Sequence, residues 1–228
     1  MKDPIYHREA ETEYTGVVRW VHWLRFFSIA ILTCTGFYIA SVFIAPMVSS
    51  EPVLFMHAKM RMVHLIFGFL LLGLTIFKTY YFFASKSKIE KLERMSFKSV
   101  FELKTWVDQI KYYLLIGKHP QLHGVYNPLQ TVAYMGLYAL MVILCLTGLI
   151  MYAHIYHNGL GGFLSFLRPI EALMGGLAPV RMVHHIATWA VMIFLLGHVY
   201  MVIFNSIKGK EGGLDSIVSG IKFKKSGH

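Results

Sequence analysis

Four of the chain's 12 histidines lie within, or at the ends of, long apolar segments: His22, His64, His184 and His198. Ionisable side chains in such segments are costly and are usually functional. Imidazole can ligate metal ions, carry protons or form hydrogen bonds in a packed core. One such histidine could be an ordinary core residue, but four at matched depths indicate ligation of a metal or a cofactor.

The spacing of His184 and His198 places both on nearly the same face of one helix. They are 14 residues apart, which leaves an offset of about 40° and an axial separation of about 21 Å. One helix therefore presents two imidazoles, one near each membrane surface, and each needs a partner at its own depth. By depth, His22 matches His198 and His64 matches His184.

Two imidazole pairs at two depths fit the axial ligands of two haems. Zinc is a poor alternative because it takes four protein ligands at one point. His185 could replace His184, but its offset from the face of His198 is about 140°, so we favour His184. The sequence therefore predicts an inner pair, His22 and His198, on one haem iron and an outer pair, His64 and His184, on the other.

Four apolar segments must position these histidines, and each is long enough to cross a membrane, which takes about 20 helical residues. The spans run approximately over residues 20–44, 62–84, 129–153 and 182–204. Only helices or closed barrels cross lipid, and the lack of period-2 alternation favours helices. We predict an all-α integral membrane four-helix bundle, with residues 1–228 forming a single domain. Only 15% of the residues are charged, against about a quarter in soluble domains.

Lysines and arginines are concentrated in the loop 85–128 and the tail 205–228, and they are sparse in the other two connections. The positive-inside rule then places this loop and both termini in the cytoplasm. The same rule explains the net charge of +10, so we expect no nucleic-acid partner.

Apolar residues recur at helical spacing between Phe97 and Leu114, with lysines and acids between them. This pattern predicts an amphipathic helix in the loop between spans two and three. It either lies on the cytoplasmic face of the membrane or packs on the bundle.

An arginine lies three residues before three of the four histidines: Arg19, Arg61 and Arg181. Residues at i and i+3 are neighbours on a helix, so these arginines could pair with haem propionates. The alternative is that each arginine anchors a helix end at the lipid headgroups.

Glycines in three spans could give a macrocycle room. Gly36 lies 14 residues after His22, on the same face and one haem-depth deeper. Gly68 and Gly148 are further candidates. Close helix packing alone is the alternative explanation.

Several motifs between residues 14 and 204 share a pattern with a known family. They are VRWVHWL at 18–24, TGFY at 35–38, RMVH at 61–64, NP at 127–128, TG at 147–148, His184 with Trp189, and GHVYM at 197–201. With them the chain resembles the b-type cytochrome subunit of membrane-bound nickel–iron hydrogenases, a relative of the formate dehydrogenase gamma subunit.

The resemblance implies a dihaem cytochrome b with two haem b groups, multi-pass in the bacterial inner (cytoplasmic) membrane and surrounded by lipid. Such a subunit anchors the periplasmic hydrogenase small and large subunits. It transfers electrons from their iron–sulfur clusters across the membrane to quinone, either menaquinone or ubiquinone. The resemblance thus implies that the chain is the quinone-reducing part of a hydrogen:quinone oxidoreductase and that the hydrogenase chemistry resides in the partner subunits.

The resemblance also implies a quinone site near His198 and the start of span three. Asn127 would bond a quinone carbonyl there, and His123 would relay a proton. Asn127 before Pro128 could instead cap the helix, since Asn is a favoured cap and Pro a favoured first residue. Family members often carry His directly before this Asn–Pro pair, where this chain has Val125 and Tyr126.

Three other functions compete with this prediction. The chain could be the cytochrome b subunit of a formate dehydrogenase or of another periplasmic oxidoreductase. It could be a histidine-based proton or metal-ion transporter, or a passive membrane anchor. His154 and His157, which follow span three, are assigned no role.

Overall fold

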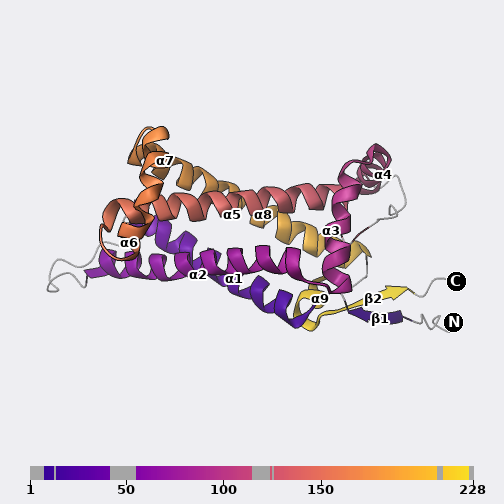
Figure 1. Ribbon diagram of the computed structural model, residues 1–228. Helices are drawn as coiled ribbons and strands as arrows, with labels where there is room; N and C mark the ends of the chain where they lie inside the picture. The colour runs from indigo at the N-terminus through magenta and orange to yellow at the C-terminus, as the bar shows by residue number, and fades with distance from the viewer. Residues whose placement is uncertain are drawn as a thin grey trace, which may run out of the picture. The chain divides into compact units, whose positions relative to one another are not determined.

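The fold is described from a computed structural model, which describes residues 8–12, 14–41, 55–114, 124, 126–209 and 213–225. Four helices in these ranges are long and apolar enough to cross a membrane (Figure 1). They are α1 (Gly16–Ala40), α2 (Met56–Ala84), α5 (Pro128–Ile155) and α8 (Leu177–Gly209). The predicted all-α class with four membrane-spanning helices is confirmed.

The helices extend beyond the apolar spans that hydropathy predicts. Helix α2 begins at Met56, before the predicted start at residue 62, and includes Lys59 and Arg61. Its 29 residues measure about 44 Å, which exceeds the hydrocarbon core and matches a bilayer with its headgroups, about 40–45 Å. Residues 42–44, in the predicted first span, lie outside the described residues.

The long helices leave many apolar side chains exposed and bury several small polar side chains. Only 11–22% of the most apolar window of each helix is buried, whereas Ser28, Thr35, Thr75 and Thr147 are buried. Each of these hydroxyls donates to the carbonyl four residues earlier, so none of them leaves a buried donor unpaired. This distribution is typical of helices whose apolar faces contact lipid.

The chain divides into two compact units, and each contains part of every long helix. Unit 1 comprises Met1–His22, Tyr81–Leu137 and Met192–His228, and unit 2 comprises Trp23–Tyr80 and Tyr138–Val191. Unit 1 therefore holds the predicted inner pair of histidines, and unit 2 holds the outer pair. The predicted single domain stays a prediction.

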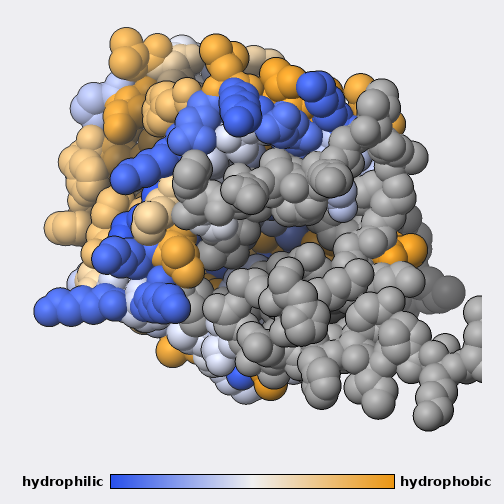
Figure 2. Space-filling model, turned by 90° about the vertical axis from the view of Figure 1, so that its right-hand side faces the viewer, coloured by the Kyte–Doolittle hydropathy of each residue, from blue (hydrophilic) through white to orange (hydrophobic). Residues whose placement is uncertain are grey.

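Unit 1 adds two helices from the loop after α2. Helix α3 (Lys88–Val100) is tied to the end of α2, since Arg94 donates to the carbonyls of Phe82 and Ser85. Helix α4 (Leu103–Tyr113) and the following Leu114 present an exposed apolar stripe, Leu103, Val107, Ile110 and Leu114. Figure 2 shows this end of the molecule, where strongly hydrophilic side chains lie beside hydrophobic ones. The position of α4 on a membrane surface stays a prediction.

Unit 1 also contains a ribbon that the sequence analysis does not predict. Strands β1 (Arg8–Thr12) and β2 (Ile221–Lys225) pair antiparallel, from Arg8 opposite Lys225 to Thr12 opposite Ile221. Helix α9 (Gly213–Ser219) precedes β2, and Gly220, which lies between the helix and the strand, has a φ of 85°. Glycine suits this left-handed position, which ends the helix and starts the strand.

Unit 2 contains a helical connection between α5 and α8. It is made of α6 (Leu160–Phe163), the 3-10 helix η2 (Leu164–Leu167) and α7 (Arg168–Leu173). Leu164 and Leu167 are buried in a cluster with Ile150, Ala153 and Val180. The connection therefore packs against the C-terminal end of α5 and the N-terminal end of α8.

Candidate functional site

The predicted outer pair lies together in unit 2. His64 on α2 and His184 on α8 have ring centres 6.5 Å apart, with an angle of 60° between the ring planes. Both residues are half-buried, whereas the neighbouring His185 is exposed. This placement supports the choice of His184 over His185.

A threonine hydroxyl faces the Nδ1 atom of each outer histidine. Thr35 Oγ1 of α1 lies 2.9 Å from His64 Nδ1, and Thr147 Oγ1 of α5 lies 2.8 Å from His184 Nδ1. Because Nδ1 is engaged in each ring, the available ligand atom is Nε2. All four long helices thus contribute one residue each to this site.

Gly36 and Gly148, each directly after one of these threonines, lie against the outer imidazoles. A Cβ atom at Gly36 would lie 3.2 Å from His64 Cε1, and one at Gly148 would lie 3.8 Å from His184 Cε1. Gly36 therefore lies in close contact with the His64 imidazole. At Gly68 a Cβ atom would meet nothing within 4 Å.

The predicted inner pair lies together in unit 1. His22 on α1 and His198 on α8 have ring centres 6.5 Å apart, with an angle of 48° between the planes. Phe194 stacks on His198, with ring centres 5.8 Å apart and 12° between the planes, and Tyr134 meets it edge-on at 5.9 Å. Aromatic rings therefore pack against both the face and the edge of the His198 imidazole.

The distance between the rings fits an axial ligand pair. Two imidazoles on one metal ion, each at a metal–nitrogen distance of about 2 Å, have ring centres about 6 Å apart. Both pairs have 6.5 Å. Among the described residues, no group of three or more His, Cys, Asp or Glu side chains could hold a metal ion. Two facing imidazoles at this separation match the ligand set of a haem iron that takes two protein ligands.

The three predicted arginines differ in their surroundings. Arg19 donates to the carbonyl of Val218, and its guanidinium lies close to Gly220. Arg61 and Arg181 are exposed near the starts of α2 and α8. Pairing of these arginines with haem propionates stays a prediction.

Asn127 caps helix α5. Its side-chain Oδ1 accepts a hydrogen bond of 2.8 Å from the backbone N–H of Gln130. The side-chain Oε1 of Gln130 accepts one of 3.2 Å from the backbone N–H of Asn127. This reciprocal arrangement is a capping box, and Pro128 occupies the first helical position. A role of Asn127 toward quinone stays a prediction, and His123 lies outside the described residues.

Tyr126 precedes this cap and packs edge-on against Tyr134, with ring centres 4.9 Å apart. Burial of its hydroxyl, together with the nearby Tyr14 and Glu93, raises the pKa of the Tyr126 phenol well above its ordinary value. The phenol is therefore neutral at physiological pH.

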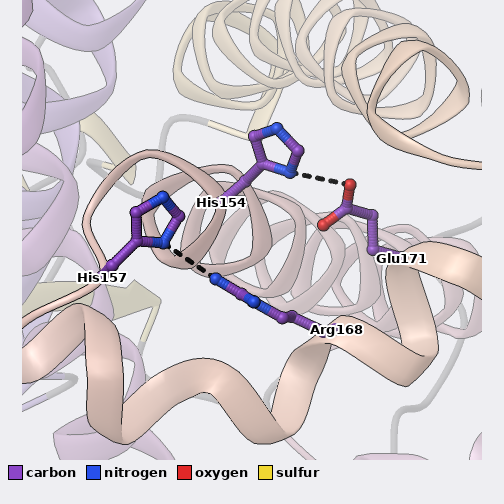
Figure 3. A network of polar contacts seen from close by, with 4 residues as sticks. All are labelled: His154, His157, Arg168 and Glu171. Carbon is purple, nitrogen blue, oxygen red and sulfur yellow. Dashed lines mark hydrogen bonds and ion pairs between the residues drawn. The ribbon is translucent and has the colours of Figure 1, made fainter.

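His154 and His157, to which the sequence analysis assigns no role, contact residues of the connection between α5 and α8; His154 lies in the last turn of α5, and His157 follows that helix. His154 pairs with Glu171 at 2.9 Å, and His157 contacts Arg168 at 2.8 Å (Figure 3). These four side chains line a pocket of about 520 Å³. The first contact joins the last turn of α5 to α7, and the second joins the residues just after α5 to α7.

Sequence reasoning missed the threonines at the outer site and the rings at the inner site. A signal for the threonines was present, since the dipeptide Thr–Gly occurs in both α1 and α5, at 35–36 and 147–148. Nothing in the sequence pointed to Tyr134 and Phe194, because aromatic residues are frequent throughout the spans.

Four membrane-spanning helices with two pairs of facing imidazoles are the arrangement expected of a membrane-bound cytochrome b. A family described as prokaryotic cytochrome b561 matches residues 13–220, and the chain belongs to this family. It is thus a prokaryotic multi-pass membrane protein that binds haem b and takes part in electron transport. The predicted resemblance is confirmed.

Curated relatives match along nearly the whole chain. A protein of Rhizobium leguminosarum bv. viciae named "Probable Ni/Fe-hydrogenase B-type cytochrome subunit" is 24% identical over 225 residues, which is 96% of this chain and 91% of the relative. The "Probable Ni/Fe-hydrogenase 1 B-type cytochrome subunit" of Escherichia coli K12 is 26% identical over 222 residues, 94% of this chain and 91% of the relative. A relative from Rhodobacter capsulatus is 22% identical over 223 residues, 96% of this chain and 83% of the relative.

Proposed function

We propose that the chain is the dihaem cytochrome b subunit of a membrane-bound nickel–iron hydrogenase. It would anchor the hydrogenase small and large subunits on the periplasmic side of the inner membrane and pass their electrons across the membrane to quinone. The observation that carries this proposal is the occurrence of two imidazole pairs with the same ring separation of 6.5 Å, one in each unit. The printed names of the relatives support the hydrogenase partner.

Each pair has a distinct role in this proposal. His64 and His184 would hold the outer haem b, and His22 and His198 would hold the inner one. Haem iron supplies a reversible one-electron carrier, and its potential depends on the axial ligands and on burial. The protein's part is to fix the four imidazole rings and to surround them with apolar helices that keep water away.

The proposed orientation follows from the positive charges. The loop that forms α3 and α4 carries Lys88, Lys91, Arg94, Lys98, Lys104 and Lys111. The connection from α5 to α8 carries only Arg168 before α8 begins. The positive-inside rule then supports cytoplasmic termini and a periplasmic connection between α5 and α8.

Quinone would be reduced near His198 and the start of α5. A quinone carbonyl needs a hydrogen-bond donor, and the side-chain amide nitrogen of Asn127 would be that donor, since its Oδ1 caps the helix. His123 would relay a proton from the cytoplasm. Both roles come from the family resemblance.

The test is hydrogen-dependent quinone reduction by the purified complex of this chain with its hydrogenase. His64→Ala and His198→Ala should each lower quinone reduction at least tenfold and leave hydrogen oxidation with a soluble dye unchanged. His185→Ala, at the exposed neighbour of His184, is the matched control and should behave as wild type.

Wild-type quinone reduction in both His64→Ala and His198→Ala would contradict the proposal and favour a passive anchor. Copurification of a formate dehydrogenase in place of a hydrogenase would assign the chain to that partner instead.

A further inference from the structure

The two outer histidines are held by the same structural device on two different helices. In α1 and in α5 a Thr–Gly dipeptide faces one imidazole, with the threonine hydroxyl at Nδ1 and the glycine beside Cε1. Both threonines are buried, with 5% of Thr35 and 3% of Thr147 exposed. Such a repeated arrangement at two ligands of one site indicates a common role.

The hydrogen bonds of each threonine determine which imidazole nitrogen carries the proton. Thr35 Oγ1 lies 2.8 Å from the carbonyl of Ile31, and Thr147 Oγ1 lies 2.7 Å from the carbonyl of Ile143. A hydroxyl has one hydrogen, and it is donated to that carbonyl. The oxygen therefore meets the imidazole with a lone pair, so Nδ1 donates and Nε2 is left unprotonated for a metal.

We propose that Thr35 and Thr147 are positioning residues that fix the ligating tautomer of His64 and His184 and lower the reduction potential of the outer haem. The inference rests on the proposed ligation of that haem by these two histidines. An acceptor on Nδ1–H makes the imidazole a stronger electron donor, which favours the oxidised iron. A lower potential at the outer site favours electron transfer toward the inner one.

The inner pair provides an internal comparison. His198 is bounded by the ring faces and edges of Phe194 and Tyr134. Neither outer threonine belongs to the unit that holds the inner pair. Removal of a threonine hydroxyl should therefore change the outer haem alone.

The test replaces each threonine by valine, which keeps the shape and removes the hydroxyl, and measures both haem midpoint potentials by spectroelectrochemical titration. Thr75→Val is the matched control, because Thr75 is buried and bonds the carbonyl of Leu71 in the same way at 2.8 Å. Thr35→Val and Thr147→Val should each shift one midpoint to a more positive value. Thr75→Val should shift neither.

Serine variants decide the case where a valine variant loses haem. Thr35→Ser and Thr147→Ser keep the acceptor and should restore both the haem content and the wild-type potentials. Serine variants as defective as the valine variants would overturn the proposal. So would unmoved midpoints in valine variants with full haem content.

His64→Ala separates this inference from the proposed function. The haem that this variant loses is the outer one, and its midpoint is the one that the threonines should control. If His64→Ala kept both haems, the ligand assignment itself would fail. If it lost one haem while the valine variants kept wild-type potentials, only the role of the threonines would fail.

Discussion

Gly36→Ala should weaken retention of the outer haem, whereas Gly148→Ala should not. An added Cβ atom at position 36 would lie 3.2 Å from His64 Cε1, and one at position 148 would lie 3.8 Å from His184 Cε1. Carbon atoms in good contact lie about 3.5–4.0 Å apart. His64 must therefore move by a few tenths of an ångström in the first variant, while His184 keeps its place in the second.

The magnitude follows from overpacking. Forcing an extra carbon atom into a packed contact typically costs about 1–3 kcal/mol, and a cost of that size at the ligand corresponds to roughly 5- to 150-fold weaker haem binding. The substitution also favours the helix by about 1 kcal/mol, so the fold should persist. Gly68→Ala, with nothing within 4 Å of the new atom, brings only this favourable term.

The assay is the rate at which the purified variants lose haem to excess apomyoglobin. Gly36→Ala should release one of two haems faster than wild type, and Gly148→Ala and Gly68→Ala should match wild type. Equal release from all three variants, or faster release from Gly148→Ala than from Gly36→Ala, would refute the placement of His64 against Gly36.

Leu167→Ala should destabilise the connection between α5 and α8 by about 2–5 kcal/mol, because it opens a cavity in a buried cluster. Thermal unfolding in detergent measures this loss of stability. Leu173→Ala is the control and should have little effect, because Leu173 is 89% exposed. The raised pKa of Tyr126 means that its neutral phenol stabilises the fold below the unfolded-state pKa of about 10 and that this contribution is lost as the pH rises through the folded-state pKa. The free energy of unfolding of Tyr126→Phe should therefore fall less steeply with rising alkaline pH than that of wild type. Parallel plots of unfolding free energy against pH would show that Tyr126 does not contribute. If α4 lies on the membrane surface, a spin label at Leu103 in lipid vesicles should collide less with a water-soluble relaxation agent than a label at Lys111, and equal accessibility would favour a helix in water.

The spans and the histidine pairs could be predicted because a membrane helix has few alternatives. Lipid requires a continuous helix across each apolar run, and the rise and twist of that helix fix the relation of His184 to His198. The helix ends were harder to predict. Lys59 and Arg61 remain helical in α2, while hydropathy marks only the part that crosses the hydrocarbon.

The remaining features depend on contacts between distant residues. The bond between Thr35 and His64 joins residues 29 positions apart, and the one between Thr147 and His184 joins residues 37 apart. The Thr–Gly repeat was visible, but only the helix packing shows that the hydroxyls face Nδ1. Pairing of β1 with β2 likewise joins opposite ends of the chain, and a strand of five residues carries little periodic signal.

The most direct test of the account is a reduced-minus-oxidised spectrum of the purified protein, with haem quantified per chain, for wild type and His198→Ala. Ligation by two imidazole pairs predicts two low-spin b haems in the wild type and a fall toward one in the variant. A colourless wild type, or a variant with unchanged haem content, would contradict the pairing of His198 with His22.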